Sequence, residues 1–96
     1  MYSDISISRI KQLLNNINII DIREERIFKK GNIPNSINIP IYKLLSDPAF
    51  YFKRDNKYFI YCNKGYSSEY VCKILANEGY QVFNILGGYK AWLNEK

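Results

Sequence analysis

Histidine is absent from this chain of 96 residues, and cysteine occurs only twice, at Cys62 and Cys72. The sequence therefore lacks both the usual zinc ligand and the usual general base of enzymes. Two cysteines are too few for the disulfide framework of a small secreted protein. No apolar stretch approaches the roughly 20 residues of a membrane-spanning helix, and the polar start with Asp4 is unlike a secretory signal peptide. We expect a soluble, cytoplasmic protein in a reducing setting, with no metal, no cofactor and no membrane association.

Positive charge is present in moderate excess. The formal net charge is +5, and lysine and arginine gather within residues 26–30 and 53–57. These residues form no regular helical stripe and no recognised nucleic-acid motif, so nucleic acid is not an expected partner. Two interpretations remain for the charge, a solvated surface that keeps the protein soluble and an attraction for a small anion or an acidic partner.

Short apolar runs alternate with segments of helical spacing along the chain. The 47% apolar content supports one domain, residues 1–96, which at this length buries roughly 65% of its unfolded surface. The patterns predict strands at 17–22, 37–39, 57–62 and 80–86, and helices at 8–16, 24–30, 41–47, 67–79 and 87–95. Strands that are apolar throughout and separated by helices predict an α/β fold, with a central parallel β-sheet and helices on both faces.

The segment around Cys62 is the strongest candidate for a chemically reactive site. Cys62 ends the predicted strand 57–62, Gly65 follows three residues later, and a helix is expected to begin near Ser67. Functional groups of parallel sheets gather at the carboxyl ends of strands, where backbone N–H groups and a helix dipole favour an anion. Such surroundings favour a thiolate without help from histidine. Lys64 adds positive charge, and Gly65 is suited to a positive φ angle.

Two interpretations of Cys62 stand at this point, a buried apolar side chain and a reactive nucleophile. Cys72 lies inside a predicted helix on its inward face, so we expect it to be structural. A cysteine phosphatase needs an arginine six residues after its nucleophile, where this chain has Ser68, and a thioredoxin-like pair needs a cysteine where it has Gly65. A thiolate that holds sulfur as a persulfide needs only the cysteine, N–H donors and a rim that tolerates anions.

Four segments resemble, in order and spacing, the motifs of single-domain rhodaneses, a family of sulfurtransferases. "IIDIRE" (19–24) is similar to the family's strand that ends in Asp-x-Arg, and "GNIPNSINIP" (31–40) resembles its Gly-His-Ile-Pro-Gly-Ala-Ile-Asn-Ile-Pro segment. "YCNKGYSS" (61–68) has the Cys-x-x-Gly-x-x-Ser spacing of its active-site loop, and "LGGYKAW" (86–92) resembles its Gly-Gly-x-x-x-Trp ending. The resemblance covers nearly the whole chain.

The resemblance implies a rhodanese-like fold and transfer of a sulfane sulfur through a persulfide on Cys62. The implied donor is a small anion such as thiosulfate and the acceptor is cyanide or another thiophile. A protein thiol or a persulfide is an alternative partner. The loop that would cradle the persulfide with its backbone N–H groups consists of Cys62, Asn63, Lys64, Gly65, Tyr66 and Ser67. The resemblance adds Asp21, Arg23 and Ser68 as supporting residues.

Two pairs of interpretations stay open within this implied site. Asp21 and Arg23 either form an ion pair that orders the loop after the strand or contact the substrate directly. Tyr66, at the tip of the loop, either borders the mouth of the pocket or is ordinary surface.

The chain also departs from the family pattern. Many rhodaneses carry arginine second or sixth in the loop, where this chain has Asn63 and Ser67. Lys64 is then the only charge that the loop supplies, so we expect weaker binding of small anions or a dependence on Lys64 and the basic segments. Asn35 replaces the usual second glycine of the 31–40 motif.

Three functions other than thiosulfate-type sulfur transfer remain compatible with these residues. A sulfur carrier would use the same persulfide with a protein thiol or a low-molecular-weight persulfide as its partner. A non-catalytic interaction module would use the loop to bind a partner, but such modules usually lose the cysteine. A redox-sensing thiol would need only an exposed, readily ionised cysteine.

Overall fold

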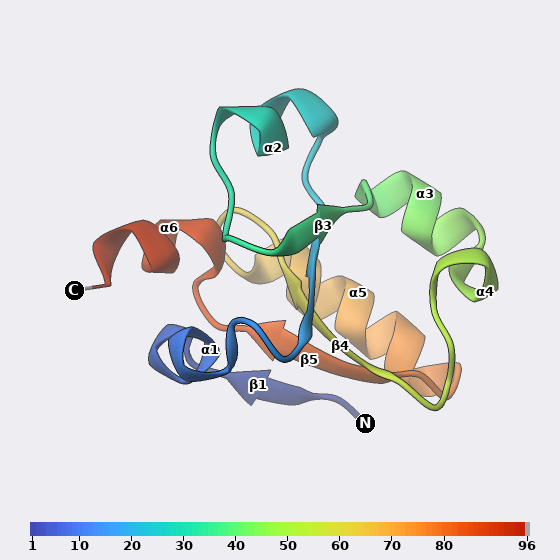
Figure 1. Cartoon of the computed structure of the whole chain (residues 1–96). Coiled ribbons are helices and arrows are strands. Elements are labelled where there is room, and N and C mark those ends of the chain that lie inside the picture. Colours follow the sequence, from blue (N-terminus) through green and yellow to red (C-terminus); the bar gives the residue numbers. More distant parts are fainter. Residues whose placement is uncertain (96) are drawn as a thin grey trace.

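A five-stranded parallel sheet forms the centre of the computed structural model, which describes residues 1–95. The strands lie in the order β1-β5-β4-β2-β3, and each neighbouring pair is parallel. Figure 1 shows this sheet running through the molecule. The strands are β1 (Ser3–Ile5), β2 (Asn18–Asp21), β3 (Ser36–Asn38), β4 (Lys57–Tyr61) and β5 (Gln81–Ile85). The predicted α/β fold with a central parallel sheet is confirmed.

Helices cover both faces of the sheet, as predicted. Residues of α1 and α6 join one hydrophobic core and residues of α3, α4 and α5 join the other (Figure 1). Helix α2 has no buried residue and lies outside both cores. The helices are α1 (Ile7–Leu13), α2 (Glu25–Lys30), α3 (Ile41–Ser46), α4 (Pro48–Tyr51), α5 (Tyr66–Asn77) and α6 (Gly88–Asn94).

Strand β4 connects the two cores because its side chains alternate between the faces of the sheet. Tyr58 and Ile60, with Cys62 just beyond the strand, belong to the core beneath α5. Phe59 and Tyr61 belong to the core beneath α1 and α6. Every β4 residue after Lys57 is buried, which is why the strand is apolar from Tyr58 to its end.

The hydroxyl of Tyr61 ties the segment before β3 to the centre of the sheet. Its oxygen accepts the backbone N–H of Ile33 at 3.1 Å and lies 3.2 Å from Ser36 Oγ. Tyr61 is fully buried. Burial and the side chain of Asp21 raise the pKa of this phenol, so the hydroxyl stays protonated.

Two elements escaped sequence prediction. Strand β1 has three residues with no buried side chain, too short for a recognisable alternation, and it forms only because it pairs with β5 at the sheet edge. Helix α4 begins at Pro48, where the preceding helix was expected to stop. The predicted end of α3 before Pro48 is correct, but proline is also well suited to the first position of a new helix, and α4 was missed.

The predicted bounds differ from those of the structure by up to three residues, and two of the differences concern residues singled out from the sequence. Helix α1 is capped by Ser6, whose Oγ accepts the N–H of Arg9 at 3.2 Å, and not by Ser8 as its first apolar residues suggested. Strand β4 ends at Tyr61, so Cys62 directly follows the strand and is not its last residue.

Asn35 adopts φ 69°, in the left-handed region. Asparagine is among the few residues other than glycine that tolerate this conformation. Its side-chain amide donates to Asn15 Oδ1 at 2.6 Å, which holds the turn against the segment after α1. The replacement of the expected glycine is therefore compatible with the same turn.

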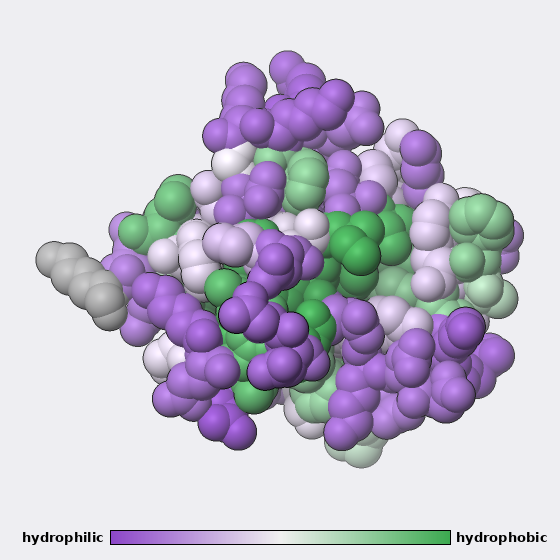
Figure 2. Space-filling view, viewed as in Figure 1, coloured by the Kyte–Doolittle hydropathy of each residue, from purple (hydrophilic) through white to green (hydrophobic). Residues whose placement is uncertain are grey.

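Hydrophilic residues cover most of the face seen in Figure 2, and hydrophobic residues gather near its middle. Several aromatic side chains are nevertheless exposed, among them Tyr42, Phe50, Tyr66 and Tyr70. Within residues 1–95, no helix is long and apolar enough to cross a membrane.

Replacing Tyr61 with phenylalanine tests the tie between β4 and the segment before β3. Tyr61→Phe leaves the N–H of Ile33 buried without a partner, so we expect a loss of about 1–3 kcal/mol in the free energy of unfolding. Urea denaturation measures this loss. Tyr70→Phe, at a position 60% exposed, serves as the control and should change stability by less than about 0.5 kcal/mol. Equal effects of the two substitutions would contradict the role of the Tyr61 hydroxyl.

Candidate active site

Cys62 lies between the end of β4 and the beginning of α5, in a loop that α6 holds in place. The first turn of α6 donates two backbone hydrogen bonds to this loop, from Tyr89 N–H to the Cys62 carbonyl at 2.9 Å and from Lys90 N–H to the Asn63 carbonyl at 3.0 Å. Cys62 itself is only 7% exposed. The loop is therefore fixed by a segment that lies more than twenty residues further along the chain.

Backbone N–H groups converge on the sulfur of Cys62. Gly65 N–H donates to Sγ at 3.1 Å, and Ser68 N–H donates to it at 3.4 Å. The Ser68 hydroxyl oxygen also lies 3.4 Å from Sγ. Two amides and the positive end of the α5 dipole thus surround the sulfur, an arrangement that favours negative charge there.

Gly65 makes the turn into α5 possible. It precedes the helix at φ 99°, in the left-handed region that glycine occupies without steric cost. A Cβ at this position would lie 3.0 Å from the backbone nitrogen of Gly87. The loop and the Gly-Gly segment before α6 therefore approach each other at backbone distance.

Gly88 is required by the same close approach between the Cys62 loop and α6. It has φ 59°, and a Cβ built on it would collide with the carbonyl oxygen of Cys62 and lie 2.9 Å from the carbonyl carbon of Asn63. The Gly-Gly pair found in the sequence thus has a physical reason, because a side chain here would push the loop away from α6.

Asp21 and Arg23 form a buried ion pair beside the site. Arg23 Nη2 lies 2.7 Å from Asp21 Oδ2, and Arg23 Nε also donates to this carboxylate. The remaining donor capacity of Nη2 goes to the Gly31 carbonyl at 2.8 Å, and the guanidinium lies 4.4 Å from the Tyr89 ring centroid. Burial disfavours the charge of Arg23, but the Asp21 carboxylate outweighs it, and the pKa of Arg23 is raised.

This geometry separates the two interpretations of the pair. The side chains of Arg23 and Asp21 are 7% and 0% exposed. Nε and Nη2 of Arg23 are engaged with Asp21 and with the Gly31 carbonyl, which favours the interpretation as a brace between the end of β2 and the segment after α2, although Arg23 also lines the cavity at Cys62.

A cavity of about 370 Å³ opens at Cys62. Five of the six predicted loop residues line it, and Arg23 contributes to its wall, whereas the N–H groups of Gly65 and Ser68 contact the sulfur but these residues do not line the cavity. Three residues that the sequence did not single out also line it, Ile22, Glu24 and Ile41, which follow β2 or open α3. Their position at the end of a predicted strand or shortly after one was the available signal. The lining consists of Ile22, Arg23, Glu24, Ile41, Cys62, Asn63, Lys64, Tyr66 and Ser67.

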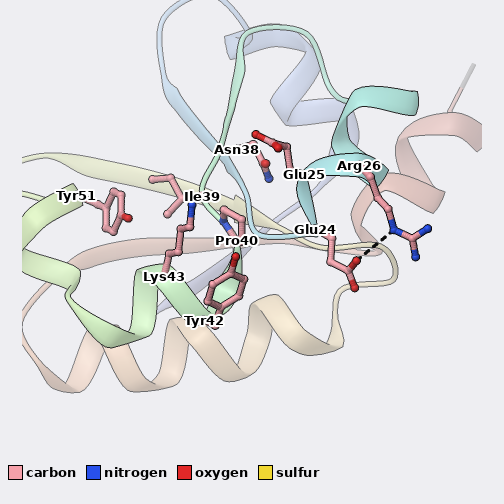
Figure 3. Close-up of a pocket in the computed structure, with 9 residues that line it drawn as sticks. All are labelled: Glu24, Glu25, Arg26, Asn38, Ile39, Pro40, Tyr42, Lys43 and Tyr51. Carbon is pink, nitrogen blue, oxygen red and sulfur yellow. Dashed lines mark hydrogen bonds and ion pairs between the residues drawn. The ribbon is translucent and has the colours of Figure 1, made fainter.

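A second, larger cavity of about 470 Å³ adjoins the first and shares Glu24 with it. Figure 3 shows Glu24 paired with Arg26 at one end of this cavity and Tyr51 at the other, with Tyr42 and Lys43 of α3 along it. Glu24 Oε2 lies 3.4 Å from Arg26 Nε, and both side chains are exposed. The surroundings of the Cys62 cavity are therefore charged and open to solvent on this side.

Cys72 is fully buried in the core beneath α5. Burial, followed by the nearby charges of Asp4 and Cys62, raises the pKa of the Cys72 thiol to about 12. Cys72 therefore remains protonated and unreactive at neutral pH. Within residues 1–95, no group of three or more histidine, cysteine, aspartate or glutamate side chains is arranged to hold a metal ion.

Residues 6–95 match the family described as the rhodanese-like domain. This match covers the loop around Cys62, the Asp21–Arg23 pair and the Gly-Gly segment before α6. The chain belongs to the rhodanese-like domain family. Its rhodanese-like fold is confirmed by a crystal structure of a rhodanese-related protein from Thermoplasma volcanium, with a TM-score of 0.89 and 29% sequence identity over 97% of this chain and 92% of that one.

Among the curated relatives of this chain are two whose names state an activity. A sulfurtransferase from Allochromatium vinosum is 32% identical over 75 residues, which cover 77% of this chain and 69% of the relative. The thiosulfate sulfurtransferase GlpE from Coxiella burnetii is 27% identical over 97 residues, covering 96% of this chain and 88% of the relative. Several other curated relatives are longer, and this rhodanese-like chain spans about half of their length or less.

Removing the Arg23 guanidinium tests the buried brace. Arg23→Gln leaves the Asp21 carboxylate buried without its counter-charge, so we expect a loss of about 3–5 kcal/mol in the free energy of unfolding, measured by urea denaturation. The matched control is Arg26→Gln, which removes an equally charged side chain from an exposed ion pair and should cost about 0–1 kcal/mol. A loss of stability no larger at Arg23 than at Arg26 would refute the brace.

Adding a methyl group at Gly88 tests whether α6 holds the Cys62 loop. Gly88→Ala should cost more than the roughly 1–2 kcal/mol that a left-handed conformation costs an alanine, because the methyl also meets backbone, and it should change the alkylation rate of Cys62. Gly79→Ala is the control, since Gly79 has φ 92° but its Cβ would meet only the flexible side chain of Arg54. Gly79→Ala should cost about 1–2 kcal/mol and leave the alkylation rate unchanged. A Cys62 alkylation rate that Gly88→Ala leaves at the wild-type value would show that α6 does not hold the loop.

Proposed function

We propose that this chain is a sulfurtransferase that carries a sulfane sulfur as a persulfide on Cys62. The observation that supports this most directly is the pair of N–H donors, from Gly65 and Ser68, that point at Sγ at the bottom of an open cavity. Such donors stabilise a negatively charged sulfur, because they lie at the positive end of the α5 dipole. Membership of the rhodanese-like family and the names of two relatives agree with this chemistry.

The proposed reaction has two steps with thiosulfate as the donor. The Cys62 thiolate attacks the outer sulfur of thiosulfate and forms a new S–S bond, while the original S–S bond breaks and its electron pair leaves with sulfite. Cyanide or a thiol then attacks the terminal sulfur of the persulfide, and the bond to Cys62 breaks with its electron pair on Sγ. Thiocyanate or a new persulfide is released and the thiolate is restored, so no cofactor is needed.

Cys62 is proposed as the only residue that forms covalent bonds. Asn63, Lys64, Tyr66 and Ser67 line the cavity that would receive the donor, and Lys64 supplies the positive charge of the loop. Arg23 lines the same cavity, but its guanidinium is engaged with Asp21 and Gly31, so we assign it a supporting role.

This distribution of charge bears on the choice of donor. With one loop cation at the cavity, a small dianion such as thiosulfate gains less attraction than it would from several arginines. The partly apolar wall formed by Ile22, Ile41 and Tyr66 suits a larger sulfur compound. A protein thiol or persulfide is therefore the second candidate partner, and either partner requires the reduced thiol that a cytoplasmic setting maintains.

Intact mass spectrometry tests the persulfide directly. Purified, reduced protein mixed with thiosulfate should gain the mass of one sulfur atom, and cyanide should remove it with release of thiocyanate. Cys62→Ser should gain nothing. Cys72→Ser should behave like the unchanged protein, because the buried Cys72 thiol stays protonated.

The outcomes of this experiment separate the candidate functions. A sulfur atom gained from a persulfide donor but not from thiosulfate would identify a sulfur carrier. Reversible oxidation of Cys62 by peroxide, with no sulfur gained from either donor, would indicate a redox-sensing thiol. Absence of both reactions would refute covalent chemistry at Cys62 and leave the loop as a binding surface.

A further inference from the structure

A line of side-chain hydrogen bonds runs from the edge of the sheet to Cys62. Asn84 Nδ2 donates to Asp4 Oδ1 at 3.3 Å, and Ser68 Oγ donates to Asn84 Oδ1 at 2.6 Å. Ser68 Oγ in turn lies 3.4 Å from Cys62 Sγ. Asn84 and Ser68 are 3% and 0% exposed, so the contacts of Ser68 with Asn84 and Cys62 are shielded from water. The proposed sulfur transfer makes no use of Asp4 or Asn84.

The carboxylate of Asp4 sets the direction of the whole line. A carboxylate only accepts hydrogen bonds, so Asn84 must turn its NH₂ group toward Asp4 and its carbonyl oxygen toward Ser68. Ser68 has one hydroxyl hydrogen and donates it to Asn84. The competing acceptor, the Gly65 carbonyl, is 3.3 Å away. The Ser68 oxygen therefore presents lone pairs to Cys62 and accepts the S–H of the thiol.

We propose that Asp4 and Asn84 are positioning residues that keep the Ser68 hydroxyl hydrogen away from Cys62 and so limit how much of the thiol ionises. When Cys62 loses its proton, the lone pairs of Ser68 Oγ face a negative sulfur unless the hydroxyl turns. Turning leaves the buried carbonyl oxygen of Asn84 without a partner, which is unfavourable. The inference rests on the proposed function only in taking Cys62 as the reacting thiol.

The strand pairing explains how a short exposed strand reaches the site. Asp4 of β1 lies directly beside Asn84 of β5 in the parallel register. The Asn84 side chain lies on the α5 side of the sheet. It meets Ser68, which belongs to the first turn of α5. An edge strand with no buried residue thus contributes to the surroundings of the thiol.

Other ionisable groups also lie around Cys62 and act on it in every variant considered below. Each keeps its charge when Asn84 or Ser68 is replaced, so a difference between variants reports the hydrogen-bond line. These groups are Arg23, Glu24, Lys64, Tyr66, Glu69 and Cys72.

Replacing Asn84 with leucine removes the acceptor that holds the Ser68 hydroxyl. The hydroxyl is then free to donate to the thiolate, a stronger acceptor than the neutral Gly65 carbonyl. The pH midpoint of Cys62 alkylation by iodoacetamide should fall by about one unit, equivalent to about tenfold more thiolate below the midpoint. Peptide mass spectrometry distinguishes alkylation of Cys62 from that of Cys72. Adding Ser68→Ala to Asn84→Leu should abolish the fall.

If Asn84→Leu does not fold, a second variant tests the same proposal. Asp4→Asn, at an exposed position, frees Asn84 to turn its NH₂ group toward Ser68, and the midpoint should fall in the same direction. The fall should persist at about 1 M salt, where the charge of an exposed carboxylate is screened. Asp55→Asn, the same change at a distant exposed carboxylate, should leave the midpoint unchanged.

If Asn84→Leu folds, a midpoint that stays the same or rises in this variant would overturn the proposal. If it does not fold, the same result in Asp4→Asn would overturn the proposal. A fall that survives Ser68→Ala would also overturn it, because the hydroxyl would then not be the group that moves. Alkylation needs no sulfur donor. Failure of sulfur transfer and failure of this inference therefore give different results.

Discussion

The contact between α6 and the Cys62 loop is the constraint on which the candidate site depends. The N–H groups of Tyr89 and Lys90 bind the carbonyls of Cys62 and Asn63. Because a peptide group is planar, these two bonds fix the orientation of the peptide groups that join Cys62 to Asn63 and Asn63 to Lys64, and so the course of the loop from its first residues. Gly65 and Ser68 then donate to the sulfur. The terminal helix thereby shapes a site to which it contributes no side chain in contact with sulfur.

The same contact explains where glycine is necessary. Gly65 and Gly88 both have positive φ angles, and a side chain on either would meet backbone of the opposing segment. The buried Asp21–Arg23 pair completes this arrangement from the other side, because Arg23 stacks over Tyr89 at the beginning of α6. The buried ion pair therefore supports the site through the position of α6.

Much of the fold was predictable because its central strands are buried on both faces. The apolar runs around β2, β4 and β5 and the helical spacing of α5 are strong local patterns, and the structure has these elements within a few residues of the predicted bounds. Strand β1 was not predictable, since its three residues carry no burial pattern and its order comes from pairing with β5. Helix α4 was missed because a proline both ends one helix and begins the next.

The features of the candidate site also divide into those that the sequence predicts and those that it does not. The amino-acid sequence by itself determined that a cysteine follows a buried strand, that a glycine comes three residues later, and that a helix begins there, because these features depend on neighbouring residues. The tertiary structure decided that Arg23 also binds the Gly31 carbonyl, that α6 holds the loop, and that Asp4 and Asn84 reach Ser68. Each of these contacts joins different segments of the chain. They depend on the order of the strands, on burial and on the direction of hydrogen bonds, and local sequence patterns reveal none of these.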